Sequence, residues 1–280
     1  MKIKEVRHLL TYGCNLRCQH CYLSAGEVGD NKPADLSQEE VDRFYHYFKP
    51  DVVSATGGEP LLRIEMVYKL AKSLAAYGGA LEIVTNGFML TKGIADELKK
   101  LNKKTFFQIS LDGTKDYHNK IRKSPLAYDN AMDAIKLVAG KGFVTKVRLT
   151  ATNENVKQIP KVIEALSSLG NENIRLVIRP VVAKGRAKAN DLKLDIDYKE
   201  LESLKELSEV IIVETTDNEG KCGCGTDTIA IDPFGGIYPC TYFVFDENYK
   251  MGNIWDLPSK LTENEEFAGF KGACYARQAV

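Results

Sequence analysis

The residues of this chain whose types and spacing most clearly predict chemistry are its seven cysteines. Three of them, Cys14, Cys18 and Cys21, lie close together in the run CNLRCQHC. Three thiolates so near one another can converge on one metal centre, and sulfur ligands favour zinc or an iron–sulfur cluster. A structural zinc ion normally takes a fourth ligand, here His20 or a distant residue. Three cysteines on a four-iron cluster instead leave one iron open for a substrate or cofactor.

The other four cysteines lie in the last quarter of the chain, after about 200 residues without any. They are Cys222, Cys224, Cys240 and Cys274. An odd number of cysteines without an export signal favours metal binding or catalysis over a disulfide scaffold. The layout therefore predicts two separate metal sites, of which the second is either a zinc site ligated by these four cysteines or a cluster.

The elements that position these residues follow a simple alternation over the first 180 residues. Short β-rich runs alternate with amphipathic helical runs, and one helix opens with a capping box of Ser37 and Glu40. Strands are predicted over 6–11, 51–55, 81–85, 106–111, 146–150 and 174–178, and further helices over 64–77, 90–101, 127–141 and 159–169. Six such units in series predict a parallel sheet, either open or curled into a full or partial barrel.

Unusual residues follow the first four predicted strands, where the site of such a sheet is expected. Cys14 follows the first, Gly57-Gly58-Glu59-Pro60 the second, Asn86-Gly87 the third and Asp112-Gly113 the fourth. After Pro180 the pattern breaks into a basic linker, a helix over 197–208 and a β-hairpin over 229–240.

Composition excludes several other classes of protein. The chain has 280 residues, of which 44% are hydrophobic and 27% charged, which is ordinary for a globular protein. Lys+Arg and Asp+Glu number 38 each, so no global charge recruits nucleic acid or an anionic membrane. Without a membrane-spanning run or a signal peptide, we expect a cytoplasmic protein with no nucleic-acid or membrane partner.

The cysteine run, with His20 before its third cysteine and Tyr22 after it, resembles the radical S-adenosylmethionine (radical SAM) superfamily over roughly residues 5–180. The resemblance implies a partial (β/α)6 barrel of the TIM type, within the α/β class. It further implies that Cys14, Cys18 and Cys21 hold a 4Fe-4S cluster whose open iron binds SAM. One electron then cleaves SAM to methionine and a 5′-deoxyadenosyl radical, which takes a hydrogen atom from the substrate. A reductase, or a flavodoxin- or ferredoxin-type protein, would supply that electron.

The same resemblance implies which residues bind SAM. Gly57, Gly58, Glu59 and Pro60 match the family's GGEP motif, which binds the SAM amino group. On this interpretation Gly58→Val would weaken SAM binding and leave the cluster intact. Asn86 and Ser110 would contact the ribose and carboxylate, and Tyr22, Asp112 and Arg122 complete the expected cofactor-binding set. Asp112 could instead brace its own turn, and Arg122 could be an ordinary solvated arginine.

The C-terminal cysteines resemble auxiliary-cluster domains called SPASM and, in their shorter form, twitch. Cys224, Gly235 and Cys240 fit the first part of that pattern, and Cys222 and Cys274 would complete the ligands of one 4Fe-4S or 2Fe-2S cluster. The chain would then divide into a barrel (1–182), a linker (183–196) and a twitch-like α+β domain (197–280).

Relatives with such C-terminal domains mostly modify peptides, so modification of a peptide or protein side chain is the predicted function. Two alternatives remain: radical oxidation of a small molecule or cofactor precursor, and a zinc-stabilised binding protein without chemistry. The sequence does not identify the hydrogen that is taken, and it points to no catalytic side chain.

Overall fold

The computed structural model describes residues 2–27, 33–195, 212–215 and 223–256. In these residues one ten-stranded sheet runs in the order β10-β9-β8-β1-β2-β3-β4-β5-β6-β7. Its centre is six parallel strands in sequence order, which confirms the predicted α/β class: β1 (Glu5–Leu9), β2 (Val52–Thr56), β3 (Ala80–Thr85), β4 (Thr105–Ser110), β5 (Thr145–Ala151) and β6 (Ile174–Pro180).

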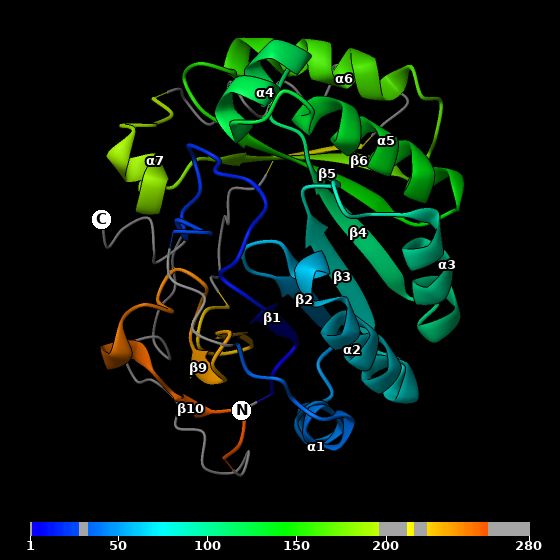
Figure 1. Ribbon diagram of the computed structural model, residues 1–280, viewed down its shortest axis with the longest axis vertical. Coiled ribbons are helices and arrows are strands. Elements are labelled where there is room, and N and C mark those ends of the chain that lie inside the picture. Colours follow the sequence, from blue (N-terminus) through cyan, green and yellow to red (C-terminus); the bar gives the residue numbers. More distant parts are fainter. Residues whose placement is uncertain (1, 28–32, 196–211, 216–222, 257–280) are drawn as a thin grey trace.

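Helices cover the outer side of this curved sheet (Figure 1), which gives the predicted partial barrel. They are α1 (Gln38–Phe48), α2 (Ile64–Tyr77), α3 (Lys92–Leu101), α4 (Lys115–Arg122), α5 (Ala127–Gly140) and α6 (Ile159–Ser167). The predicted capping box is present: the Glu40 amide donates to Ser37 Oγ at 3.2 Å, and the Ser37 amide donates to Glu40 Oε2 at 2.8 Å. Sequence reasoning missed α4, a short helix of low hydrophobicity.

The two faces of the sheet differ in character. On β5 the buried Val147 and Leu149 belong to the apolar core between sheet and helices, whereas Lys146, Arg148 and Thr150 face the inside of the barrel. Because side chains alternate between the two faces of a strand, this two-residue period separates the core from the inner, polar surface. The functional site lies on that inner surface.

The sheet continues beyond the six central strands at both ends. β7 (Ile212–Thr215) pairs parallel to β6, and β8 (Thr228–Ile231) pairs parallel to β1. β8 and β9 (Gly236–Tyr238) form the predicted antiparallel hairpin, and β10 (Gly252–Asn253) pairs with β9. The hairpin that carries the second cysteine group is thereby attached directly to the first strand of the barrel.

Part of the predicted linker is ordered as the short helix α7 (Gly185–Ala189). The predicted helix over 197–208 lies outside the described residues, and the domain boundaries at 182 and 196 remain predictions. Among the described residues, no helix is long and apolar enough to cross a membrane.

Candidate functional site

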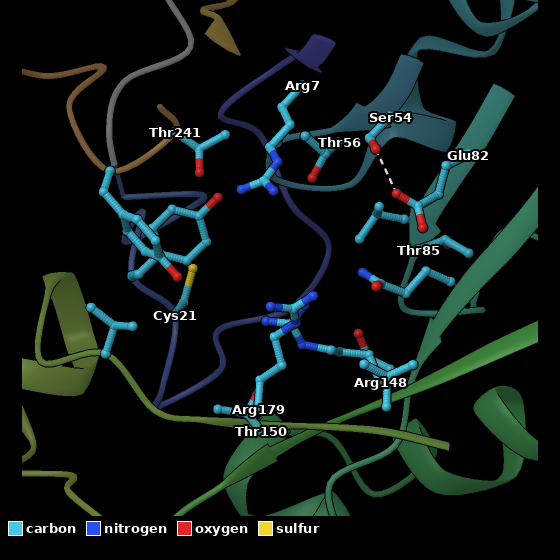
Figure 2. A pocket seen from close by; sticks show the side chains of 18 of the residues that line it. Arg7, Cys21, Ser54, Thr56, Glu82, Thr85, Arg148, Thr150, Arg179 and Thr241 are labelled. Carbon is cyan, nitrogen blue, oxygen red and sulfur yellow. Dashed lines mark hydrogen bonds between the residues drawn. The ribbon is translucent and has the colours of Figure 1, made fainter. Parts of the chain in front are cut away.

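One cavity of about 680 Å³ occupies the inside of the barrel. Its walls carry Cys14, Cys18 and Cys21, and on another side Cys224 and Cys240. Figure 2 shows polar side chains from several strands pointing into this space. Both predicted cysteine groups, so far as they lie in the described residues, therefore face the same cavity.

The first cysteine group lies on the loop that follows β1. Cys18 is buried, and Cys14 and Cys21 are half-buried. Each sulfur accepts a hydrogen bond, from the Leu16 amide to Cys14 (3.4 Å), from the Ala25 amide to Cys21 (3.4 Å) and from Arg122 to Cys18 (3.8 Å). Hydrogen bonds of this kind stabilise thiolate ligands and help to set the reduction potential of an iron–sulfur cluster. Burial raises the pKa of the Cys14 thiol to about 11, so a bound metal would be needed to hold the thiolate at neutral pH.

Helix α7 holds this cysteine loop in place. The Arg186 amide donates to the Cys21 carbonyl (2.9 Å), and Arg186 Nε donates to the Cys18 carbonyl (2.7 Å). Gly185 has φ +53°, and a Cβ there would lie 2.5 Å from the Tyr22 carbonyl oxygen. A segment interpreted as a simple linker is thus packed against the cysteine loop through backbone contacts that its sequence does not reveal.

The two glycines of the GGEP turn line the cavity and pack against the strand end that leads into the cysteine loop. The Gly58 amide donates to the Thr11 carbonyl (2.8 Å), and the Glu59 amide donates to the Gly13 carbonyl (2.9 Å). Gly57 has φ +115°, and a Cβ on Gly58 would lie 1.9 Å from the Gly13 oxygen. The glycines are therefore required for contact between two backbones, in addition to any ligand they approach.

Glu59 and Pro60 lie behind this turn, outside the residues that line the cavity. Glu59 is fully buried, and its carboxylate accepts hydrogen bonds from the Leu61 amide (3.1 Å), the Thr85 hydroxyl (2.8 Å) and the Asn86 amide (2.9 Å). Burial raises the pKa of Glu59, and the hydrogen bond from the Asn86 amide opposes that effect. The structure thus gives Glu59 a role in joining the GGEP turn to the end of β3.

Asn86 and Ser110 line the cavity, as predicted for SAM-binding residues. Asn86 Nδ2 donates to Asn15 Oδ1 at 2.8 Å, which links the end of β3 to the cysteine loop. Tyr22 also lines the cavity. The placement of these three side chains fits contact with a ligand bound beside the cysteines, and that contact stays a prediction.

Asp112 and Arg122 form a buried ion pair beside Cys18. Arg122 Nε donates to Asp112 Oδ2 at 2.7 Å, and Nη1 of the same guanidinium donates to Cys18 Sγ at 3.8 Å. Burial alone would raise the pKa of Asp112, but Arg122 and the neighbouring histidines hold it well below its usual range. Arg122 is only 7% exposed, so its interpretation as a solvated arginine is wrong. Asp112 also accepts from the Thr150 amide (3.0 Å), which agrees with a bracing role.

Cys224 and Cys240 are brought together beside the β8–β9 hairpin. Both are buried and belong to one apolar cluster with Phe243. Two residues after Cys240, the ring of Tyr242 stacks edge-on against Tyr22, with 4.9 Å between ring centroids. Cys222 and Cys274 lie outside the described residues, so their predicted roles as ligands stay predictions.

Within the described ranges, no three Cys, His, Asp or Glu side chains surround a point that one metal ion could occupy. His20, the proposed fourth zinc ligand, has its Nε2 3.5 Å from Asp112 Oδ2. Three sulfurs on one loop, each with its own donor, are chemically suited to the larger iron–sulfur cluster.

Sequence reasoning missed the cationic side chains on the inner surface. Arg7 on β1, Arg148 on β5 and Arg179 on β6 extend into the cavity (Figure 2). On β5 the sequence does carry a signal for them, because polar residues recur at every second position, as in Lys146-x-Arg148-x-Thr150. A strand with apolar residues on one face and charged residues on the other is typical of a sheet that encloses a polar cavity.

The comparisons with known proteins agree with this geometry. This chain is 25% identical to the antilisterial bacteriocin subtilosin biosynthesis protein AlbA of Bacillus subtilis over 96% of its own length, and it spans just under two thirds (66%) of AlbA. An AdoMet-dependent heme synthase of Methanosarcina barkeri is also 25% identical, over 95% of this chain and 86% of the synthase. The mycofactocin maturase MftC of Mycolicibacterium smegmatis is 26% identical, and this chain spans 66% of its length.

Solved structures show the same fold. Streptococcus suis SuiB bound to S-adenosylmethionine superposes with a TM-score of 0.76 at 17% identity, covering 95% of this chain and 67% of SuiB. The enzyme anSMEcpe with bound AdoMet gives a TM-score of 0.70 at 20% identity, covering 94% of this chain and 82% of anSMEcpe. The family model described as the radical SAM superfamily matches residues 9–166, more than half of the chain. This protein belongs to the radical SAM superfamily, whose enzymes use a 4Fe-4S cluster and SAM.

Proposed function

We propose that this enzyme cleaves SAM reductively and takes a hydrogen atom from a peptide or protein side chain. The observation that carries the proposal is that the three cysteines and the glycine turn meet on the wall of one cavity whose remaining walls are free for a substrate. When bound, the cluster and SAM would supply a 5′-deoxyadenosyl radical, at the cost of one electron from a donor protein.

The chain's own residues would hold and orient these groups. Cys14, Cys18 and Cys21 would ligate the cluster, and the cavity-lining Gly57 and Gly58 would let the SAM amino group approach the backbone. Asn86 and Ser110 would orient the rest of SAM. These assignments rest on the family motifs and on the position of each residue at the cavity wall.

Modification of a peptide is supported by the relatives. AlbA is described as a bacteriocin biosynthesis protein, and SuiB has been solved bound to its precursor peptide SuiA. Two observations favour the alternative of small-molecule oxidation. A cavity of about 680 Å³ is of ordinary size for a small-molecule site, and the heme synthase is an equally similar relative. A non-catalytic zinc protein has less support, since the chain belongs to a family of enzymes.

The proposed function predicts a coupled reaction that mass spectrometry can follow. Anaerobically prepared protein, SAM and dithionite should yield 5′-deoxyadenosine and methionine in equal amounts. A peptide that co-purifies with the protein, or is encoded beside its gene, should change mass in the same incubation and only when SAM is present. SAM cleavage with an unchanged peptide would favour the small-molecule alternative, and absence of cleavage would contradict the proposal.

We further propose that Cys224 and Cys240, with Cys222 and Cys274, ligate one auxiliary iron–sulfur cluster. Support comes from the juxtaposition of Cys224 and Cys240 at the cavity wall. A cluster there would line the same cavity as the first cysteine group and could anchor the substrate or accept an electron.

The auxiliary site can be separated from the SAM site by a double substitution. In Cys224→Ala/Cys240→Ala the iron content should fall by about two to four per chain, depending on cluster type. SAM cleavage should continue without formation of the substrate product. Unchanged iron content would contradict the auxiliary site. Circular dichroism of the variant provides the control, because metal affinity in small domains is also folding energy.

A further inference from the structure

We propose that the part of the substrate held in the cavity carries a carboxylate, which binds to Arg148 with the help of Arg7 and Arg179. This inference rests on the proposed function and adds the chemical class of its substrate. It concerns Arg148 on β5, Arg179 on β6 and Arg7 on β1, whereas Arg122 beside the cysteine loop belongs to the SAM side of the cavity.

Several cationic side chains line the cavity, and most of them are neutralised by carboxylates of the protein. These ion pairs are Arg7 with Glu5 (2.8 Å), Lys146 with Glu82 (3.2 Å) and Arg122 with Asp112 (2.7 Å). The protein therefore compensates buried charge on this inner surface where it can, as the cost of burying an unpaired ion requires.

Arg148 is the exception that the structure reveals. Its Nε atom is buried without a hydrogen-bond partner, and among the described residues Arg148 forms no ion pair. Its side chain extends from the middle of β5 into the cavity. A guanidinium has five N–H donors. A buried N–H without a partner lowers the stability of the protein unless a ligand or water accepts its hydrogen bond.

Two further guanidinium groups face Arg148. Figure 2 shows Arg179 beside it and Arg7 extending toward both from the opposite wall. Burial, followed by the charges of Arg179 and Arg7, lowers the pKa of Arg148 to about 10, while Tyr242 acts in the other direction. Arg148 therefore remains protonated at neutral pH, close to two other guanidinium groups, of which Arg7 is paired with Glu5.

A carboxylate is the ligand that fits this arrangement. It accepts two parallel hydrogen bonds from one guanidinium, and its charge offsets the repulsion among the three arginines. A neutral amide of the same shape would leave the repulsion in place. The carboxylate could belong to an acidic side chain of a peptide or to a small polycarboxylate, and both present the same group to Arg148.

Binding measurements with matched probes test this inference. The reconstituted protein, saturated with SAM and without reductant, would be titrated calorimetrically with acetyl-Glu-Glu-Glu-amide and with its Gln counterpart, and with glutarate and glutaramide. We expect at least one charged probe to bind at least about tenfold more tightly than its neutral partner, a preference typical of a desolvated charge pair. Binding of the tripeptide indicates a peptide source, and binding of glutarate alone indicates a small molecule.

Three variants give the control. Arg148→Gln should abolish the preference for the charged probe, Arg148→Lys should retain part of it, and Arg43→Gln, at an exposed position on α1, should leave it unchanged. Arg148→Gln should also unfold no earlier than wild type, because it removes an unpaired charge. Its affinity for SAM should be unchanged, so loss of SAM binding instead of probe binding would overturn the inference. Equal binding of charged and neutral probes to wild type would overturn it as well.

Failure of this inference can be told apart from failure of the proposed function. If 5′-deoxyadenosine forms but wild type shows no preference for either charged probe, the carboxylate inference fails and the radical chemistry stands. If the probes bind through Arg148 but SAM is not cleaved, the anion site stands and the proposed reaction fails.

Discussion

Cys18→Ala is expected to abolish SAM cleavage completely and to lower the iron content by about four per chain, the size of one 4Fe-4S cluster. Cys18 is the most deeply buried of the three loop cysteines, and its sulfur accepts from the buried Arg122. Removing the sulfur takes away a ligand and also leaves that guanidinium facing an apolar methyl group.

The measurement combines iron analysis, electron paramagnetic resonance of the reduced protein and quantitation of 5′-deoxyadenosine. Cys224→Ala/Cys240→Ala is the reciprocal control, because it should lose the other iron signal and still cleave SAM. A normal yield of 5′-deoxyadenosine from Cys18→Ala would refute the assignment of the loop as the SAM-binding cluster site.

The part of the fold that could be predicted is the part that local sequence determines. The capping box at Ser37 lies at the start of α1 (Gln38–Phe48). The apolar periodicity of 64–77 lies within a second helix, α2, which the structure has at Ile64–Tyr77. The hairpin after β8 is likewise marked by its own turn residues. The attachment of β8 to β1 joins segments more than 200 residues apart, and no local signal encodes such a pairing.

In the candidate site, too, locally encoded features could be predicted and long-range contacts could not. The cysteines and the glycine turn could be found because a motif carries them, and the structure places both at the cavity wall. Arg122 was expected either to bind the cofactor or to lie in solvent, since arginine is seldom buried without a partner. Its partner Asp112 lies ten residues earlier on the chain and meets it only once α4 has formed. The arginines of the inner surface alternate with apolar residues, as expected for a strand. Which face of the strand lines the cavity becomes clear only from the curvature of the whole sheet.

The glycine turn is where structure and sequence lead to different expectations. From the motif alone, a larger residue at Gly58 should weaken SAM binding and leave the cluster intact. In the structure a Cβ at this position lies 1.9 Å from the Gly13 carbonyl oxygen and 2.6 Å from its carbonyl carbon. Gly13 immediately precedes Cys14, so the strain falls on the backbone that presents the first cluster ligand.

Even Gly58→Ala should therefore reduce cluster content as well as SAM affinity, and should lower the free energy of unfolding by about 1–3 kcal/mol, as overpacking typically does. Gly140→Ala is the matched control, because a Cβ on Gly140 at the end of α5 has no atom within 4 Å. Denaturant unfolding and iron analysis of both variants check the expectation. A Gly58→Ala protein with full iron content and wild-type stability would show that residues 11–13 move aside at little cost. In that case the glycine would be required only for the approach of SAM.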